Sequence, residues 1–449
     1  MDANDGGAEA QIQKWVEAHL GPVRAVRRQE RWRPSWYVDL IQGTRPMTVY
    51  VRGSRGGDWP PKPLDYEYRV HRVFEEHGLR VPRLFGYIDS VPAIVMEMLP
   101  GRANLRFADS ESARESIRNQ LIDQMVRMHS LDPDLLRAAG AHEPEDPVRR
   151  AMSYFDQAER IYLRAKSRPQ PFLEFARKWM ARHPPEVSPS PEVVAVDAGQ
   201  FMFDGDRLTG LNDFEMVGLG DRYTDLGALR TRDRAEYIGD LNEFYSLYAR
   251  RAGIELDMKR LRYHALAIAL LTPLMISGQL SNPGTVEDHY LYQQWWGNNC
   301  KEAIEQLAEM LGIDLPVWSW PKPGRSGRYD TVFEDLSVWF RSRGEHAGAT
   351  TYEMDRKHAH VGFLQRVSIY QHEFEIEYWD DIAKLTGTRP RELDVADSLL
   401  EAFVSQARPE HDADLLCLFY RQIQRHVFLM NDPEVPNPRF ASRIPSLHV

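Results

Sequence analysis

Two aspartates near the middle of the chain have the residue type and the setting that metal-dependent chemistry uses. Asp197 follows the apolar run VVAV and Asp213 lies in the block NDFE, so both are expected at the ends of short strands in a hairpin over residues 193–216. Carboxylates at strand ends can bind a metal or orient a hydroxyl group, but ordinary turns also place aspartate there. The residue types alone therefore leave two interpretations, an active site and a plain hairpin.

The histidines of the C-terminal part offer a second set of metal-capable residues. His358 and His360 are two positions apart, which places them on opposite sides of a strand and far apart around a helix. His372 and Glu375 can share a helix face, but the sequence has no HExxH pattern and no evident fourth ligand. Solvent-exposed helix faces explain these residues better than a metal site. There is also no GxSxG motif, although a Ser-His-Asp or Cys-His site is left open by sequence alone.

The elements around the two aspartates begin with a strand-rich part. A short helix over residues 10–21 precedes two or three antiparallel strands over residues 24–53, where apolar and polar residues alternate. The stretch 64–78 has apolar residues at helical spacing and ends at a glycine, which predicts an amphipathic helix. Strands are expected again at 83–88 and 93–98. The sequence therefore predicts a small antiparallel sheet with one helix against it.

The rest of the chain is predicted to be helical, so the fold class is α+β. The hairpin over residues 193–216 interrupts the helices, which resume over residues 223–312. A connector rich in Pro, Trp and Gly precedes a charged, helical tail. The expected parts are an N-terminal lobe at 1–98, a helical lobe at 99–314, a linker at 315–330 and a C-terminal helical domain at 331–449.

Composition and charge limit the class of protein. The chain has 449 residues, 43% of them apolar and 27% charged, which fits a globular protein of two or three domains. Its net charge of −10 argues against a nucleic-acid partner, and two cysteines, Cys300 and Cys417, indicate a reducing compartment. The polar N-terminus is no targeting segment, and the apolar run at 263–278 is broken by Pro273 and too short to cross a bilayer. We therefore expect a cytoplasmic protein without a membrane partner.

Six segments occur in an order that a known family shares. They are the strand MTVYVRG, the helix YEYRVHRVFEEHGLRVPRLFG, the hinge strand AIVMEMLPG, the helix LIDQMVRMHSLD, the segment with Asp197 and the block NDFEMVGLGDRYTDLGAL. This order resembles the protein-kinase-like fold and, more narrowly, the aminoglycoside phosphotransferase family of small-molecule kinases. The resemblance covers roughly residues 15–310. It implies a bilobal fold, with a small antiparallel-sheet N-terminal lobe and a mainly helical C-terminal lobe, to which the tail adds a helical domain.

The resemblance implies roles in the transfer of the γ-phosphoryl group of ATP, with magnesium, to a hydroxyl group of a small organic molecule. Asp197 matches the aspartate that orients or deprotonates the acceptor hydroxyl, and Asp213 matches an aspartate that binds the metal. Arg52 matches the third-strand cation that meets the phosphates, with Glu67 as its ion-pair partner. Backbone groups of Met96 to Met98 match the segment that holds the adenine.

The catalytic segment departs from the family's pattern. The family has His-Gly-Asp, four further residues and a metal-binding Asn, whereas residues 195–200 read AVDAGQ. The histidine is absent and the loop is two residues shorter. Gln200 stands where the resemblance implies a metal ligand, and its longer side chain can recover some of the lost reach.

The phosphate loop departs as well. In place of a glycine-rich turn the chain has ERWRPSW, in which only Ser35 is familiar as a cofactor-binding residue. Bulky rings cannot form the same cradle of backbone amides. Either the nucleotide pocket is partly filled, or the side chains of Arg31 and Arg33 meet the phosphates instead.

Two functions follow from these agreements and departures. The NDFE and VMEMLPG segments favour an ATP-dependent phosphotransferase, whereas ERWRPSW and AVDAGQ favour a pseudokinase or repurposed fold that binds a small ligand in the interlobe cleft without phosphoryl transfer. A purely structural interaction protein is supported only by the helical tail, which is expected to add packing or homodimer contacts, or else to supply an acceptor pocket. Asp221 and Asp225 are expected to cap the helix that follows the hairpin.

Overall fold

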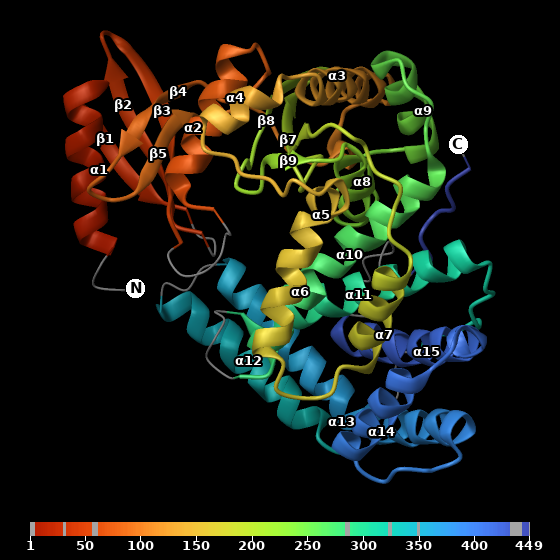
Figure 1. Cartoon of the computed structure of the whole chain (residues 1–449). Helices are drawn as coiled ribbons and strands as arrows, with labels where there is room; N and C mark the ends of the chain where they lie inside the picture. The colour runs from red at the N-terminus through yellow and green to blue at the C-terminus, as the bar shows by residue number, and fades with distance from the viewer. Residues whose placement is uncertain are drawn as a thin grey trace. The chain divides into compact units, whose positions relative to one another are not determined.

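The protein is described by a computed structural model that divides into two compact units (Figure 1). The first unit contains residues 1–153, 186–264 and 447–449, and the second contains residues 154–185 and 265–446. The lobe and domain boundaries expected from the sequence stay a prediction. The described residues are 5–29, 33–55, 62–282, 288–321, 326–347, 351–431 and 442–448.

A five-stranded antiparallel sheet forms the N-terminal part of the first unit, as the alternating pattern predicts. Its strand order is β1-β2-β3-β5-β4. In the register of β2 with β3, Ser35 lies opposite Arg52, which places both at the same end of the sheet. The strands are β1 (Val23–Arg28), β2 (Ser35–Gln42), β3 (Arg45–Gly53), β4 (Leu84–Ile88) and β5 (Ala93–Glu97).

Two helices cover this sheet, one on each face. Ile12 and Val16 of α1 (Asp5–His19) pack against the odd-numbered residues of β3 and β5, whereas Leu64 of α2 (Leu64–Glu76) packs against Ile94 and Met96. Successive residues of a strand point to opposite faces, so α1 and α2 lie on opposite sides (Figure 1). The sequence predicted one helix against the sheet, but two helices pack on it, because α1 contacts the sheet as well as α2.

The hairpin region contains four short strands rather than a single hairpin. β6 (Glu192–Val194) pairs with β9 (Gly218–Gly220), and β7 (Phe201–Asp204) pairs with β8 (Arg207–Leu211). Asp197 therefore lies between β6 and β7, and Asp213 lies between β8 and β9. The helices of the first unit are α3 (Glu111–His129), α4 (Pro133–Ala138), α5 (Pro147–Ala151), α8 (Tyr223–Ala235) and α9 (Leu241–Ala252), with a 3-10 turn at Leu105–Phe107.

The second unit is built of helices within the described ranges. Its core includes the rings of Tyr370, Phe374 and Phe428, against which Trp318 and Trp320 of the connector pack. The helices are α6 (Ser153–Ala165), α7 (Pro171–Arg182), α11 (His289–Leu311), α12 (Asp330–Ala347), α13 (Thr351–Thr386), α14 (Leu393–Gln406) and α15 (Asp412–Met430), with a 3-10 turn at Pro409–His411.

Helix α10 (Met258–Leu280) continues from the first unit into the second. It is the single described helix whose length and composition would suffice to cross a membrane, but 78% of its most apolar window is buried inside the protein. The expected break at Pro273 does not occur, since Pro273 lies inside the helix. An interior proline removes one backbone hydrogen bond and strains the preceding turn, and α10 continues through Pro273 nonetheless.

Candidate active site

The backbone that carries Asp197 is held by a buried carboxylate on α8. Asp225 accepts the N–H of Ala195 on Oδ2 at 2.8 Å and the N–H of Val196 on Oδ1 at 2.7 Å. Val196 has a φ of 67°, a left-handed conformation that is rare for a β-branched residue. His129 of α3 places Nε2 3.0 Å from Asp225 Oδ2. Asp225 is fully buried, so this network fixes the loop that presents Asp197.

The expectation that both aspartates cap α8 is therefore wrong for Asp225, whose carboxylate is bonded to the loop instead of to an N–H of its own helix. Asp221 does bond at the start of the helix, since its Oδ1 accepts the N–H of Tyr223 at 3.0 Å. Its Oδ2 accepts the N–H of Ser188 at 3.2 Å and pairs with Arg260.

The side chain of Asp197 has a partner on each carboxylate oxygen. Oδ1 is ion-paired with Arg232 of α8, and Oδ2 accepts a hydrogen bond from Gln200 Nε2 at 2.7 Å. Gly199 has a φ of 86°, and a Cβ there would lie 3.0 Å from Leu229 and 3.2 Å from Arg232. The shortened loop therefore lies directly on α8, where Arg232 reaches the candidate catalytic carboxylate.

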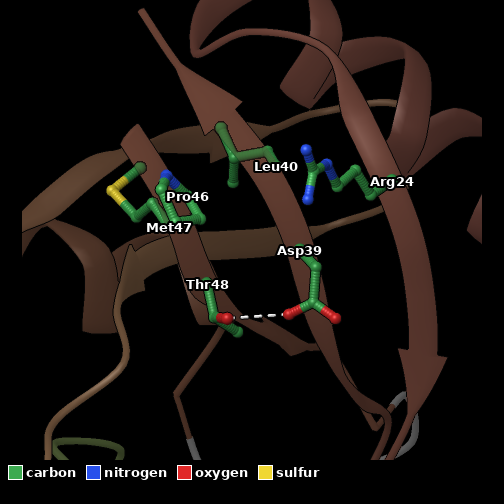
Figure 2. A pocket seen from close by; sticks show the side chains of 6 residues that line it. All are labelled: Arg24, Asp39, Leu40, Pro46, Met47 and Thr48. Atoms are coloured by element: carbon green, nitrogen blue, oxygen red, sulfur yellow. Dashed lines mark hydrogen bonds between the residues drawn. The ribbon is translucent and has the colours of Figure 1, made fainter. Parts of the chain in front are cut away.

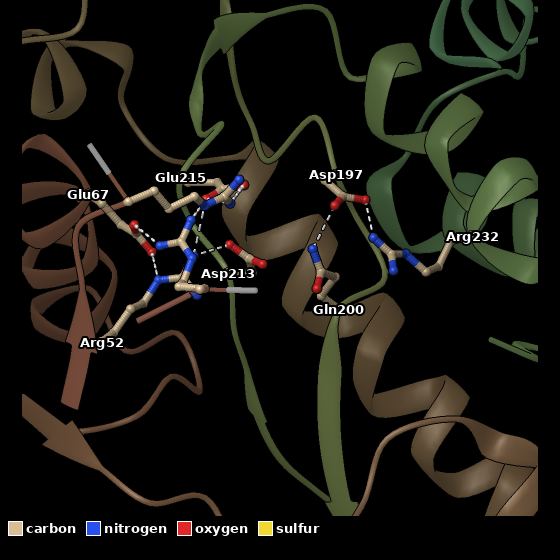
Figure 3. A network of polar contacts seen from close by, with 9 residues as sticks. Arg52, Glu67, Asp197, Gln200, Asp213, Glu215 and Arg232 are labelled. Atoms are coloured by element: carbon tan, nitrogen blue, oxygen red, sulfur yellow. Dashed lines mark hydrogen bonds and ion pairs between the residues drawn. The ribbon is translucent and has the colours of Figure 1, made fainter. Parts of the chain in front are cut away.

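A second group of charged residues surrounds Asp213. Arg52 Nε lies 2.9 Å from Glu67 Oε1 of α2, and Arg52 Nη2 is bonded to Asp213 Oδ1 (Figure 3). All three side chains are largely buried, with exposed fractions of 7%, 5% and 17% for Arg52, Glu67 and Asp213. One guanidinium group therefore joins the third strand, the following helix and the hairpin region, as the sequence predicts for Arg52 and Glu67.

The residue after Asp213 fixes it beside α2. Phe214 is buried, and its ring packs edge-on against His71 and Phe74, with centroids 5.0 and 5.2 Å away. Asp213 itself has a φ of 65°, which Asp tolerates better than most residues. The aromatic contact and the unusual backbone together direct the carboxylate toward Arg52.

Two further arginines meet at Glu215, two positions after Asp213. Arg33, from the loop between β1 and β2, is ion-paired with Glu215 and lies 3.8 Å from Glu67. Arg55 Nη2 lies 2.7 and 2.5 Å from the two oxygens of Glu215, and Arg52 Nη2 lies 3.4 Å from one of them. The side chain of Arg33 is 1% exposed and that of Glu215 is 12% exposed. The end of the sheet where Ser35 lies opposite Arg52 thus carries a cluster of three guanidinium groups.

Figure 3 shows the two groups, one around Arg52 and Glu215 and the other around Asp197. The backbone connects them, because the carbonyl of Gln200 accepts the N–H of Asn212 at 3.1 Å. The structure therefore brings Asp213, Arg52 and Glu67 together in one group. It places Asp197 and Gln200 in the other group, together with Arg232.

Burial and charge act on this cluster in opposite directions. Burial opposes the ionisation of Asp213, but Arg52, followed by Arg33 and Arg55, holds its pKa below the ordinary value. Burial raises the pKa of Glu67 although Arg52 opposes it. Burial, and next the positive charge of Arg33, lowers the pKa of Arg55 to about 9. The low pKa of Arg55 therefore reflects its burial first and the neighbouring guanidinium group of Arg33 second.

The other predicted cofactor residues lie on β2 and on or just after β5. Ser35 is buried in β2, and its Oγ donates to the carbonyl of Arg33 at 3.4 Å, so it bonds to its own loop. Met96 is buried in β5 and packs on the α2 side of the sheet, whereas Met98 is 46% exposed just after β5. Their proposed contact with adenine involves backbone groups and stays a prediction. Arg31 lies outside the described residues.

The segment after β5 is fastened to the hairpin region. Arg102 and Phe203 exchange two backbone hydrogen bonds of 2.9 Å each. Gly101 has a φ of 93°, and a Cβ there would lie 1.9 Å from the carbonyl oxygen of Phe203. Only glycine fits this approach. The backbone expected to hold a nucleotide is thereby fixed relative to the strand that follows Asp197.

The donor types expected for magnesium are present. Asp213, Asp197 and Gln200 supply carboxylate and amide oxygens, which suit this hard cation. The described residues contain no group of three or more His, Cys, Asp or Glu side chains already arranged around a common point. Magnesium would have to share these oxygens with the guanidinium groups of Arg52 and Arg232. The donor set fits the ion in type.

The sequence did not single out four residues of the site: Glu215, Arg55, Arg232 and His129. A sequence motif could have identified Glu215, since it belongs to the NDFE block. No sequence motif identifies Arg55, Arg232 or His129, because their partners are far away in the sequence.

A separate hollow lies on the N-terminal sheet (Figure 2), lined by Arg24, Asp39, Leu40, Pro46, Met47 and Thr48. Thr48 Oγ1 donates to Asp39 at 2.7 Å, and Arg27 also bonds to Asp39, at 2.7 and 2.9 Å. The predicted site residues do not line it.

The chain is similar to known proteins in sequence and in fold. Residues 37–261, half of the chain, match the model of the phosphotransferase enzyme family, APH. No curated protein sequence matches the chain. A solved structure of a candidate aminoglycoside phosphotransferase from Ralstonia eutropha has a TM-score of 0.50 and 16% identity, and the match covers 66% of this chain and 94% of that one.

Two further solved structures have lower scores. A macrolide 2'-phosphotransferase from Brachybacterium faecium has a TM-score of 0.47 and 12% identity, covering 61% of this chain and 94% of that one. The choline kinase from Streptococcus pneumoniae has a TM-score of 0.48 and 13% identity, covering 67% and 99%. At 16% identity, the Ralstonia structure supports the fold alone. With the family match, the antiparallel sheet and the helical remainder, the chain belongs to the phosphotransferase enzyme family and has a protein-kinase-like fold extended by C-terminal helices.

Proposed function

We propose that the protein transfers the γ-phosphoryl group of ATP to a hydroxyl group of a small organic molecule. Asp197 orients or deprotonates the acceptor hydroxyl, and Arg52, positioned by Glu67, meets the nucleotide phosphates. Backbone groups between Met96 and Met98 hold the adenine. The acceptor belongs to the wide class of small hydroxyl compounds, which includes antibiotics, choline, sugars and hydroxy acids.

One observation supports this proposal most. Arg52 contacts Glu67 of α2 at 2.9 Å and is bonded to Asp213 of the hairpin region. Phosphoryl transfer depends on positioning and on neutralising charge, and a cation fixed between a helix and a metal-binding carboxylate serves both purposes. The same cation is too deeply buried to act as an ordinary surface charge.

Magnesium fits the donor types of Asp213 and Gln200, which would hold it. When bound, the ion neutralises the negative charge of the phosphates. The chain itself contributes the orientation of Asp197, whose two oxygens are bonded to Arg232 and Gln200.

A second candidate function is favoured by the same ion pairs. Asp213, Asp197 and Glu215 are each paired with at least one guanidinium group. A site whose carboxylates are all neutralised by arginine suits a repurposed fold that binds a small anionic ligand without transferring a phosphoryl group.

Thermal unfolding with ATP and magnesium tests the proposal directly. A ligand at about a hundred times its Kd stabilises the folded state by about 2.7 kcal/mol, which is a shift of a few degrees in Tm. We expect millimolar ATP with magnesium to stabilise the wild type, and the magnesium-dependent part of the shift to disappear in Asp213→Ala. Asp204→Asn, at an exposed position of β7, is the matched control and should keep the full shift.

Transfer itself is measured with labelled γ-phosphate against a panel of small hydroxyl compounds. Asp197→Asn should lower the rate about a hundredfold or more while nucleotide binding persists. Absence of any stabilisation by ATP with magnesium would sink the proposal. Binding without transfer to any acceptor or to water would favour the repurposed fold.

A further inference from the structure

We propose that the side chain of Glu215 holds the place of a phosphate group, and that Arg33, Arg52 and Arg55 form a polyphosphate-binding site that needs no metal. The ligand class is a linear polyphosphate, such as the triphosphate part of a nucleotide. Assigning the site to a nucleotide rests on the proposed function. The anion site itself rests on three guanidinium groups that meet at one carboxylate.

Positive charge converges on Glu215. Arg55 contacts both oxygens of Glu215, at 2.7 and 2.5 Å, and Arg33 is paired with one of them. Arg52 lies 3.4 Å from the same oxygen. The three arginine side chains are 1%, 7% and 13% exposed for Arg33, Arg52 and Arg55. Like charges this close and this far from water repel one another strongly unless anions lie between them. Glu67 and Asp213 pair with some of these arginines, and Glu215 is the carboxylate that all three approach.

A phosphate group fits these three guanidinium groups better than a carboxylate does. A carboxylate spreads one negative charge over two oxygens in a plane, whereas a phosphate group carries more charge on oxygens that point in several directions. Guanidinium groups bind phosphate oxygens in pairs of parallel hydrogen bonds, so a phosphate group can satisfy several of them at once. Three guanidinium groups from different segments therefore match a phosphate group better than they match Glu215.

The side chain of Glu215 can give way to an entering ligand. Glu215 lies between β8 and β9, in a segment that is not part of a strand, and its side chain is 12% exposed. A change of side-chain rotamer can move its carboxylate without breaking a sheet hydrogen bond. The segment stays fixed meanwhile, because Tyr66 and Lys62 both donate to the carbonyl of Val217, at 3.1 and 2.5 Å.

At Pro34, the backbone next to Arg33 offers a phosphate group no amide N–H. Pro34 has no N–H to offer a phosphate, and its carbonyl accepts the N–H of Gly53 at 2.8 Å. A Cβ on Gly53 would lie 2.9 Å from Trp36 and 3.0 Å from the carbonyl oxygen of Pro34. Pro34 therefore packs closely on the end of β3, and this packing places the adjacent Arg33 near Arg52 and Arg55.

Calorimetric titration with sodium tripolyphosphate in EDTA, at constant ionic strength, tests the site. Glu215→Gln removes the competing charge, so tripolyphosphate should bind about tenfold more tightly than to the wild type. The double variant, in which Arg55→Gln is added to Glu215→Gln, lacks one charge-assisted contact. It should bind tripolyphosphate about tenfold more weakly than Glu215→Gln alone. Glu192→Gln is the matched control, because Glu192 is 14% exposed and pairs with Arg222 instead; its affinity should equal that of the wild type.

Equal or weaker binding by Glu215→Gln overturns the proposal, and so does the same gain in Glu192→Gln. If Glu215→Gln does not fold, the affinity of Arg55→Gln for tripolyphosphate is compared with that of the wild type. Equal affinity in the two proteins, or no detectable binding by either, then overturns the proposal. Tripolyphosphate binding without stabilisation by ATP and magnesium would retain the anion site and reject the proposed function. Stabilisation by ATP and magnesium without any binding of tripolyphosphate in EDTA would retain the proposed function and reject the anion site.

Discussion

The backbone N–H of Val196 donates to Asp225 Oδ1 at 2.7 Å, and this bond holds a left-handed residue directly before Asp197. The other oxygen of Asp225 accepts the N–H of Ala195 at 2.8 Å. A β-branched residue at positive φ costs energy that the surrounding structure must offset. Asp225 thus positions the candidate catalytic loop without touching a substrate.

Asp225→Asn should lower the free energy of unfolding by about 3 kcal/mol, because an amide has one acceptor oxygen where the carboxylate has two. Urea denaturation measures the change. Asp233→Asn is a control on the same helix, since Asp233 Oδ1 accepts the N–H of Ile238 at 2.7 Å at a half-buried position. It should cost about 1 kcal/mol. Equal losses in the two variants would contradict the role given to Asp225.

The buried pair of Arg52 and Glu67 should show strong energetic coupling. Arg52→Gln leaves Glu67 buried without its main cation and should cost about 3–5 kcal/mol. The double variant with Glu67→Gln should cost less than the sum of the single variants, and a double-mutant cycle of unfolding measures the difference. The exposed pair of Arg27 and Asp39 is the control, with expected coupling below about 1 kcal/mol. Additive effects at Arg52 and Glu67 would show that the pair is not a unit.

Stability should depend on pH through His71, which lies on α2 one turn after Glu67. Burial lowers the pKa of His71 from 6.5 to about 4, and its Nε2 lies 2.7 Å from the carbonyl of Pro82. The unfolded chain therefore binds a proton between pH 6.5 and about 4 that the folded chain does not. The contribution of His71 to the free energy of unfolding is fully present above pH 6.5. It is lost as the pH falls toward 4, by up to about 3 kcal/mol.

His71→Gln should reduce this pH dependence, because Gln does not titrate in that range. The measurement is the free energy of unfolding at several pH values between 4 and 8 for both proteins. A wild-type curve and a variant curve that stay parallel between pH 4 and 6.5 would refute the assignment.

Alanine substitutions at Gly101 and Gly205 distinguish the cost of a steric clash from the cost of backbone strain. Both have positive φ, 93° and 58°, but a Cβ on Gly101 would lie 1.9 Å from the Phe203 oxygen, whereas nothing lies within 4 Å at Gly205. Gly205→Ala should cost about 1–2 kcal/mol from strain alone. Gly101→Ala should cost clearly more, because the two backbone bonds between Arg102 and Phe203 must also shift. Similar losses in chemical denaturation would mean that the close approach is unimportant.

Local patterns were sufficient to predict much of the fold. Alternation predicted the strands of the N-terminal sheet, and helical spacing predicted α2, whose Val70 and Phe74 are buried. The same patterns placed Asp197 and Asp213 at strand ends, and the order of segments indicated the family. These features depend on neighbours within a few positions, where residue type limits the backbone to few conformations.

The sequence by itself determined the elements, the two aspartates and the pairing of Arg52 with Glu67. The tertiary structure decided that Arg33 meets Glu215, 182 positions away, and that Arg232 meets Asp197. It also decided that Asp225 holds a loop instead of capping a helix. Such contacts depend on how separate segments pack, and the charge of an arginine does not specify which distant carboxylate it will neutralise. The chemistry of this site therefore lies in long-range ion pairs that no local pattern could predict.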